Sequence, residues 1–188
     1  KIDIINQKIE FQKKSYQNLI SSISKRDNYF DCIPAIQPIS NKNLKRIGDV
    51  FGMRVCHPIY KVKKMHSGID YVAPKGTPVY ATGNGIVKSV KYSLGYGKCV
   101  EIQHNQELMT RYAHLNDYNT KIGDKVVRGQ CIGYVGSTGA TTGPHLHYEI
   151  LKNSKAIDPI FYFFGELSPA QYEKILEMAN KKVKSSLV

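Results

Sequence analysis

The amino-acid sequence predicts a mainly β protein: a small antiparallel-sheet domain with one helix at its N-terminal end and one at its C-terminal end. Two observations lead to this fold class. From about Leu44 to Asp158, short runs rich in Val, Ile and Tyr alternate with Gly, Asn and Pro, as in PVYATG, GIVKSVKY and QCIGYVG. No helical period intervenes between these runs, so consecutive strands are expected to pair directly and antiparallel.

The composition is that of one folded domain with modest appendages. The chain has 188 residues, of which 41% are hydrophobic and 22% charged, and no stretch approaches the ~20 apolar residues that cross a bilayer. These values exclude a wholly disordered chain and a membrane span within this sequence. The first residue is Lys and no leader pattern follows it, so we expect any signal or anchor to lie upstream.

Residues 1–30 are predicted to form a helical arm, because their apolar residues fit a heptad seam. These are Ile2, Ile5, Ile9, Tyr16, Leu19 and Ile23. The arm is either the stump of a coiled coil or a single amphipathic helix packed on the domain. Residues 31–47 follow as a linker or an extended arm, since their prolines oppose both helix and strand. One hypothesis is that the N-terminal arm covers the groove of the domain, because the Pro-containing connector could lay residues 31–43 across the domain.

The predicted β domain spans residues 48–160, and a helical extension follows at 161–188. In the extension, Ser168 supplies an N-cap and Pro169 stands in the first turn. An apolar stripe at helical spacing follows, made of Tyr172, Ile175, Leu176, Ala179 and Val183. We expect this last helix to serve packing and not chemistry.

The charge favours an anionic partner, because 27 Lys and Arg against 15 Asp and Glu give a formal net charge of +12. Nucleic acid, an acidic membrane surface and an acidic polymer such as cell wall all fit this excess. Nucleic acid is disfavoured, since the lysines are dispersed and no nucleic-acid-binding signature is present. The four cysteines form no C-x-x-C pair, so they are not a zinc knuckle, and they leave the redox compartment open.

The main chemical signal is the placement of the histidines. Between His145 and Ile150 the polar residues His145, His147 and Glu149 alternate with apolar ones, so a strand would present all three on one face. Residues i and i+2 of a strand lie about 6.6 Å apart. This is close enough for one imidazole to bind a metal while the other addresses a water on that metal.

His66 and Asp70 form a second pair, four positions apart. In a fully extended chain their α-carbons would lie about 13 Å apart, which is long for shared ligation, so we expect a bend at Gly68. His, Asp and a distant His supply three ligands and leave one tetrahedral position for water, the layout of a catalytic zinc site. A single His is more often a structural residue, but the two pairs together favour a metal site.

These residues resemble the M23 family of zinc metallopeptidases, the lysostaphin-like or LytM-type peptidoglycan endopeptidases. The likeness runs from about Gly48 to Asp158 and follows the family's order through Phe51–Arg54, His66–Tyr71, Ala73–Ala81, Gly95–Gly97, Tyr112–Leu115, Gly133–Gly139 and Gly143–His147. The resemblance implies a LytM/lysostaphin-like fold in which His66, Asp70 and His147 bind Zn²⁺. It also implies that His114 and His145 flank the metal-bound water and the scissile carbonyl.

Among the remaining residues of interest, His145 is our candidate general base, and His114 would hold or protonate the tetrahedral species, although the two roles could be exchanged. Tyr112 is expected on the same side of its strand as His114, where it would either pack under the site or touch substrate, and packing is favoured. We expect no catalytic role for His57 or for His104, and we expect His104 to be an exposed residue at a strand end.

The resemblance implies a zinc metalloendopeptidase that hydrolyses peptide cross-links of bacterial peptidoglycan by attack of a metal-activated water. Its partners would be stem peptides and cross-bridges and not nucleic acid, and it would work in the cell envelope (periplasmic or on the outer face of the inner membrane) or outside the cell. The N-terminal helix would provide a membrane tether or a protein contact.

Two alternatives remain. One is a catalytically silent LytM-type module that binds or activates a partner cell-wall hydrolase. The presence of all five site residues disfavours it, because silent members usually lose ligands. The other keeps the zinc chemistry but replaces wall peptide with a glycine-rich protein.

Overall fold

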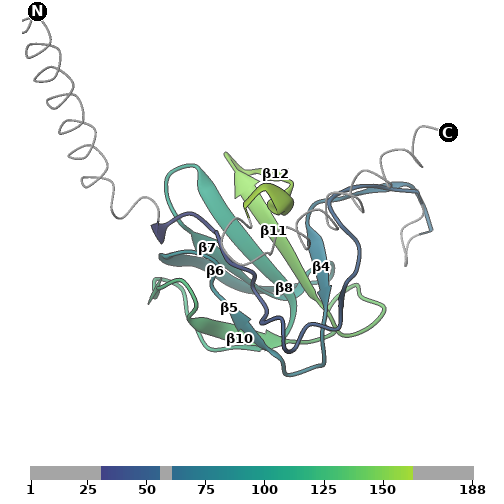
Figure 1. The fold of residues 1–188 in the computed structure, drawn as a ribbon, viewed down its shortest axis with the longest axis horizontal. Coiled ribbons are helices and arrows are strands. Elements are labelled where there is room, and N and C mark those ends of the chain that lie inside the picture. Colours follow the sequence, from purple (N-terminus) through teal and green to yellow (C-terminus); the bar gives the residue numbers. More distant parts are fainter. Residues whose placement is uncertain (1–30, 56–60, 163–188) are drawn as a thin grey trace, which may run out of the picture. The chain divides into compact units, whose positions relative to one another are not determined.

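The computed structural model describes residues 31–55 and 61–162, which contain twelve strands and one short 3₁₀ helix (Figure 1). The strands are β1 (Arg46–Ile47), β2 (Gly52–Arg54), β3 (Lys64–His66), β4 (Ile69–Val72), β5 (Pro78–Tyr80), β6 (Gly85–Ser93), β7 (Gly97–Gln103), β8 (Leu108–Tyr118), β9 (Lys125–Val126), β10 (Cys131–Val135), β11 (Leu146–Lys152) and β12 (Lys155–Ile157), and the helix is η1 (Pro159–Tyr162). The predicted N-terminal arm, His57 and residues 163–188 of the predicted C-terminal helix lie outside these ranges.

The predicted antiparallel β fold is confirmed. All paired strands run antiparallel, and the main sheet has the order β1-β4-β11-β8-β7-β6-β9. β12 pairs with the edge of β11, β10 pairs with β5 and β8, and β2 and β3 form a separate hairpin. The order brings β4 and β11 side by side although they are far apart in the sequence (Figure 1). In the described ranges no helix is both long and apolar enough to cross a membrane.

One face of the sheet builds the core. The alternation predicted for β11 is present, because Leu146, Tyr148 and Ile150 are all fully buried on this face. Tyr148 packs between Tyr71 and Tyr112, with ring centroids 6.4 Å and 5.3 Å away. Burial of large aromatic and aliphatic side chains supplies the main stabilisation of such a sheet. The residues between them point to the opposite face, which holds the polar groups.

The segment predicted as a linker, residues 31–47, packs on this domain. The Tyr80 backbone N–H donates to the carbonyl oxygen of Pro38 at 2.9 Å, and Ile39 is only 1% exposed within the core. β1, at the end of the segment, pairs with β4. Residues 31–43 line no part of the cleft that holds the histidines. The hypothesis that the N-terminal arm covers this cleft concerns residues outside the described ranges and stays a prediction.

Candidate metal centre

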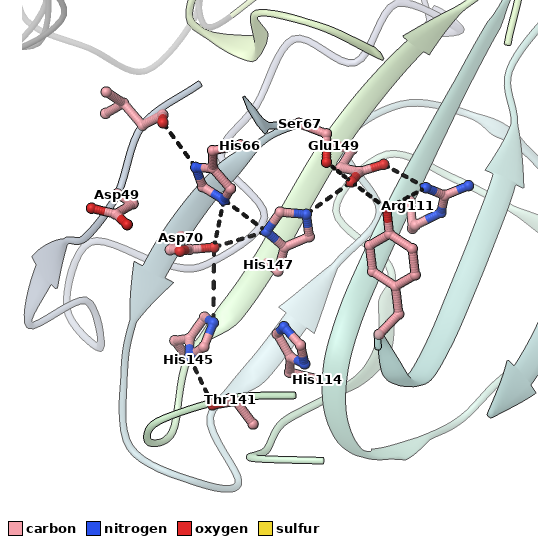
Figure 2. A network of polar contacts seen from close by, with 12 residues as sticks. Asp49, His66, Ser67, Asp70, Arg111, His114, Thr141, His145, His147 and Glu149 are labelled. Carbon is pink, nitrogen blue, oxygen red and sulfur yellow. Dashed lines mark hydrogen bonds and ion pairs between the residues drawn. The ribbon is translucent and has the colours of Figure 1, made fainter. Parts of the chain in front are cut away.

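One cleft of about 230 Å³ gathers the five side chains that the sequence predicts as metal ligands and catalytic residues. His66, Asp70, His114, His145 and His147 line it together (Figure 2). They come from β3, β4, β8, the loop before β11, and β11 itself. The spacing of these residues along the chain is wide, so the sheet order is what brings them to one place.

The bend predicted at Gly68 is present and joins His66 to Asp70. β3 ends at His66, β4 begins at Ile69, and the chain bends at Gly68 between them. A Cβ atom on Gly68 would lie 2.1 Å from the carbonyl oxygen of Tyr148, so the absence of a side chain lets the bend pass directly over β11. This bend leaves His66 Nε2 at 3.1 Å from Asp70 Oδ1.

Strand register brings the third member. Asp70 on β4 is the cross-strand partner of His147 on β11, and cross-strand partners present their side chains on the same face. His147 Nδ1 therefore lies 2.8 Å from Asp70 Oδ1 and 3.1 Å from His66 Nε2. His66, Asp70 and His147 form a group whose ligand atoms are close enough together to hold one metal ion.

The outer nitrogen of each imidazole donates to a protein acceptor. His66 Nδ1–H donates to the carbonyl oxygen of Val50 at 2.8 Å, and His147 Nε2–H donates to Glu149 Oε1 at 2.9 Å (Figure 2). When both imidazoles are neutral, as a bound metal requires, each ring carries its proton on the outer nitrogen and turns a lone pair inward. In that state, two lone pairs and a carboxylate oxygen within 2.8–3.1 Å repel one another unless a proton or a metal ion lies among them.

This set of donors fits zinc. Two imidazole nitrogens and one carboxylate oxygen are among the usual ligands of Zn²⁺, and three protein ligands leave one position open, as in catalytic sites. Tetrahedral zinc with bonds of about 2.0–2.1 Å keeps its donor atoms about 3.3 Å apart. The separations of 2.8–3.1 Å found here are close to that value.

The charge state of the cluster also favours the binding of a cation. Burial acts to raise the pKa of Asp70, but hydrogen bonds from His147 and His66 hold it well below its usual range, so the carboxylate is ionised. Burial acts to lower the pKa of His147, but its hydrogen bonds and charge interactions with Asp70 and Glu149 raise it to about 9. A proton thus competes for His147, and a metal ion that binds there displaces it.

The second oxygen of Asp70 is held by an arginine. Arg54 Nη2 donates to Asp70 Oδ2 at 2.6 Å, while Arg54 Nε lies 2.6 Å from Asp49 Oδ2. The Asp70 carboxylate is therefore fixed with Oδ2 toward the guanidinium and Oδ1 toward the two imidazoles. Arg54 was part of the sequence resemblance, but the sequence alone gave it no role.

His145 and His114 lie beside the cluster. In the described residues, the Nε2 of each ring makes no hydrogen bond and is bare, whereas the Nδ1 of each ring binds a backbone carbonyl. His145 Nδ1–H donates to the carbonyl oxygen of Gly143 at 2.8 Å, and His114 Nδ1–H donates to that of Thr138 at 2.8 Å. The two rings are 4.8 Å apart, and His145 Nε2 lies 3.8 Å from Asp70 Oδ1. Burial lowers the pKa of His114 to about 4, so this ring is neutral at pH 7 and its Nε2 is a proton acceptor.

A local irregularity in β8 turns His114 toward the cleft. Tyr112 and Leu115 both lie in the core, although residues three apart on a regular strand face opposite sides. His114 has φ of 60°, and between the pairs Val100–Tyr112 and Lys98–Leu115 one residue of β7 opposes two residues of β8. The expectation that Tyr112 and His114 share one side of the strand is therefore wrong: Tyr112 packs in the core and His114 faces the metal cluster.

His104 is not the exposed residue that the sequence suggested. It is 6% exposed and does not line the cleft. Its Nδ1–H donates to the carbonyl oxygen of Asn84 at 2.8 Å, and its Nε2 accepts from the Thr110 hydroxyl at 2.8 Å. Two satisfied hydrogen bonds inside the protein make it a structural residue.

The sequence predicts only that Glu149 lies on the same strand face as His147. The structure adds three contacts of the Glu149 carboxylate. Arg111 Nη1 donates to Glu149 Oε2 at 2.6 Å, the Tyr96 hydroxyl donates to Oε1 at 2.9 Å, and the Ser67 hydroxyl donates to the same oxygen. Burial acts to raise the pKa of Glu149, but the hydrogen bond and charge of His147, with Ser67 and Arg111, lower it to about 2. Arg111 lies on β8 and Tyr96 in the loop between β6 and β7, both far from Glu149 in the sequence. The only signal for either residue in the sequence was the motif Gly95–Gly97, which contains Tyr96.

An antiparallel β fold with two imidazoles, one carboxylate and two further histidines in one cleft is typical of a metal-dependent hydrolase. Comparison with known proteins specifies the class. Residues 64–159 match the family described as Peptidase family M23, and the chain belongs to this family.

Relatives and solved structures agree with this assignment. The peptidoglycan DD-endopeptidase ShyC of Vibrio cholerae is 44% identical over 111 residues, which are 59% of this chain and 26% of that protein. A zinc-containing peptidase from Vibrio cholerae superposes with a TM-score of 0.60 at 38% identity, covering 65% of this chain and 37% of that one. The catalytic domain of lysostaphin from Staphylococcus simulans gives a TM-score of 0.58 at 35% identity, covering 65% of this chain and 92% of that one. The chain spans between about a quarter and two fifths of the length of the curated relatives it matches.

Proposed function

We propose that this protein is a zinc-dependent endopeptidase that hydrolyses peptide cross-links of bacterial peptidoglycan, of the DD-endopeptidase class to which ShyC belongs by its name. The single observation that carries the proposal is the convergence of His66 Nε2, Asp70 Oδ1 and His147 Nδ1 within 2.8–3.1 Å of one another. The zinc-containing relative of known structure supports zinc as the ion.

The protein's own residues prepare the chemistry on either side of this cluster. Bound by these donors, zinc would supply a Lewis acid and lower the pKa of a coordinated water toward 7. We assign His145 as the general base, since its bare Nε2 lies 3.8 Å from Asp70 Oδ1 and so stands at the edge of the ligand set. The adjacent neutral His114 presents a second bare Nε2, which accepts a proton and can pass it to the leaving amine.

The catalytically silent alternative is not favoured. A module that only binds a partner needs neither the ligands nor the two flanking imidazoles, yet all five side chains line one cleft. The net charge of +12 supports a polyanionic wall polymer as the surface on which the protein works. The protein would then act in the cell envelope or outside the cell. The membrane tether or protein partner expected through residues 1–30 finds no support in the comparisons, and those residues lie outside the described ranges.

Digestion of purified sacculi and of defined cross-linked muropeptides tests the proposal. The fragments are identified by mass, with and without a metal chelator, and a glycine-rich protein is digested in parallel. We expect cross-linked dimers to be converted to monomers, and we expect the chelator to stop the reaction and added Zn²⁺ to restore it. Cleavage of the protein alone, or cleavage that is indifferent to the chelator, would contradict the proposal.

Two variants divide metal binding from proton transfer. His147→Ala removes a donor, so both bound zinc and cleavage should be lost. His145→Ala keeps all three donors, so zinc should remain at one per chain while the rate falls by about 10²–10⁴-fold, the usual contribution of a general base. Metal analysis and the muropeptide assay measure the two effects, and a His145→Ala protein with wild-type activity would refute its role.

A further inference from the structure

A row of alternating charges crosses four strands of the sheet and ends at the metal cluster. It runs from Lys91 on β6 through Glu101 on β7 and Arg111 on β8 to Glu149 on β11, with N–O separations of 3.2, 2.8 and 2.6 Å, and Glu149 then contacts His147 at 2.9 Å. The register builds this row, because Arg111 is the cross-strand partner of both Glu149 and Glu101. Cross-strand partners share a face, so the row lies on the same face as the metal cluster.

Glu149 is the most deeply buried member of the row. Its side chain is 1% exposed, whereas that of Lys91 at the other end is 50% exposed. A carboxylate in such a place is costly unless every lone pair is paired, and replacing a buried ion pair by apolar groups is often neutral or stabilising. Stability alone therefore gives little reason for a charge at position 149.

The carboxylate of Glu149 is held from three sides. Arg111 Nη1 binds Oε2, while the hydroxyls of Tyr96 and Ser67 both bind Oε1. The Arg111 guanidinium also lies over the Tyr96 ring, 4.7 Å from its centroid. The position of Oε1 is thus fixed before it accepts a hydrogen bond from His147 (Figure 2).

We propose that Glu149, fixed by Arg111, is a positioning residue that holds the His147 ring with Nδ1 toward the metal and strengthens Nδ1 as a ligand. Rotation of the ring by 180° about its Cβ–Cγ bond would exchange Nδ1 with a carbon atom and break the Nε2–H bond to Glu149. The hydrogen bond therefore selects the ring orientation that ligates. A negative acceptor at Nε2–H also raises the basicity of the imidazole, as carboxylate partners of metal-bound histidines do. This inference rests on the proposed function in that it takes zinc as the ion.

Zinc affinity of the full 188-residue chain tests this role without relying on activity. The dissociation constant is measured by competition with a chromogenic chelator for the wild-type protein, Glu149→Ala and Glu149→Gln. Loss of a carboxylate partner costs a metal-binding histidine about 10–100-fold in affinity. We expect about 100-fold weaker binding for Glu149→Ala, and about 10-fold for Glu149→Gln, which keeps an acceptor oxygen but loses the charge.

Glu107→Gln is the matched control, because it removes the same charge at a distant position. The Glu107 side chain is 58% exposed, pairs with Lys152 at 3.5 Å and does not line the cleft. Its zinc affinity should equal that of the wild-type protein. The absorption spectrum of the Co²⁺-substituted protein adds a signature that reports ligand geometry. Its visible bands should shift in Glu149→Gln and stay unchanged in Glu107→Gln.

The outcomes separate this inference from the proposed function. If Glu149→Gln binds zinc within twofold of the wild type and keeps its Co²⁺ spectrum, the positioning role is refuted while the peptidase proposal stands. If the wild-type protein itself binds no zinc, the proposed function fails and the positioning role fails with it. If Glu149→Ala does not fold, the near-isosteric Glu149→Gln decides alone, with circular dichroism confirming its fold.

Discussion

Gly68→Ala is the most direct test of how the chain assembles its metal site. The added Cβ would lie 2.1 Å from the backbone carbonyl oxygen of Tyr148, about 1.3 Å short of the 3.4 Å at which ordinary contacts begin. Tyr148 is fully buried in the middle of the sheet and cannot retreat. The bend between β3 and β4 must therefore move by about 1 Å, and it carries His66 with it.

A displacement of that size is large compared with what a metal site tolerates. Ligand distances at a working site hold to about ±0.2 Å, and a misplacement of about 1 Å costs on the order of 10²-fold in rate. We expect Gly68→Ala to fold, to bind zinc much more weakly than the wild-type protein, and to cleave muropeptides at least 100-fold more slowly. Zinc per chain after dialysis and the initial cleavage rate are the two measurements.

Gly95→Ala provides the control for zinc binding. Its Cβ would meet no atom within 4 Å and its backbone φ lies outside the left-handed range, so the same methyl group is added without a clash. Zinc content in this variant should match the wild type. Wild-type zinc affinity in Gly68→Ala would show that the close approach to Tyr148 does not set the position of His66, and the reasoning would be refuted.

Two further predictions concern stability. Burial lowers the pKa of His104 to about 4 while an unfolded His titrates near 6.5, so the unfolded chain takes up the proton first. The contribution of His104 to the free energy of unfolding is then fully present above about pH 6.5, and up to roughly 3 kcal/mol of it is lost as the pH drops toward 4. His104→Gln should lose this share of the pH dependence, measured by urea unfolding in chelator at pH 7.5 and 5. Tyr112→Phe removes the hydroxyl that accepts the Thr82 N–H at 3.0 Å, and it should cost about 1–3 kcal/mol with zinc affinity unchanged, so a neutral effect on unfolding would argue against this buried bond.

Local patterns in the sequence sufficed for the fold class and for much of the site. The alternation from His145 to Ile150 placed Leu146, Tyr148 and Ile150 in the core, and the structure agrees. The distance argument between His66 and Asp70 required a bend at Gly68, which is present. Both inferences work because a strand has a fixed rise per residue and a fixed period of two, so they need no knowledge of distant segments.

The predictions that failed each depended on contacts between segments far apart in the sequence. His104 was expected at the surface but is covered by residues near Asn84 and Thr110. His114 and Tyr112 were placed on one side of a regular strand. The extra residue in β8 relative to β7 places the two side chains on different sides of the strand. No pattern in the local sequence predicts this irregularity.

The sequence by itself determined which groups are available: an imidazole and a carboxylate joined by a bend, two imidazoles on one strand face, and the family they resemble. Only the tertiary structure decided that these groups meet. Asp70 faces His147 because β4 pairs with β11, and the left-handed backbone of His114 turns its side chain to the same cleft. It also decided that Glu149 and Arg111 stand behind His147. Strand register is a non-local property, set by how whole strands bury their apolar faces, and so it cannot be computed from any one motif.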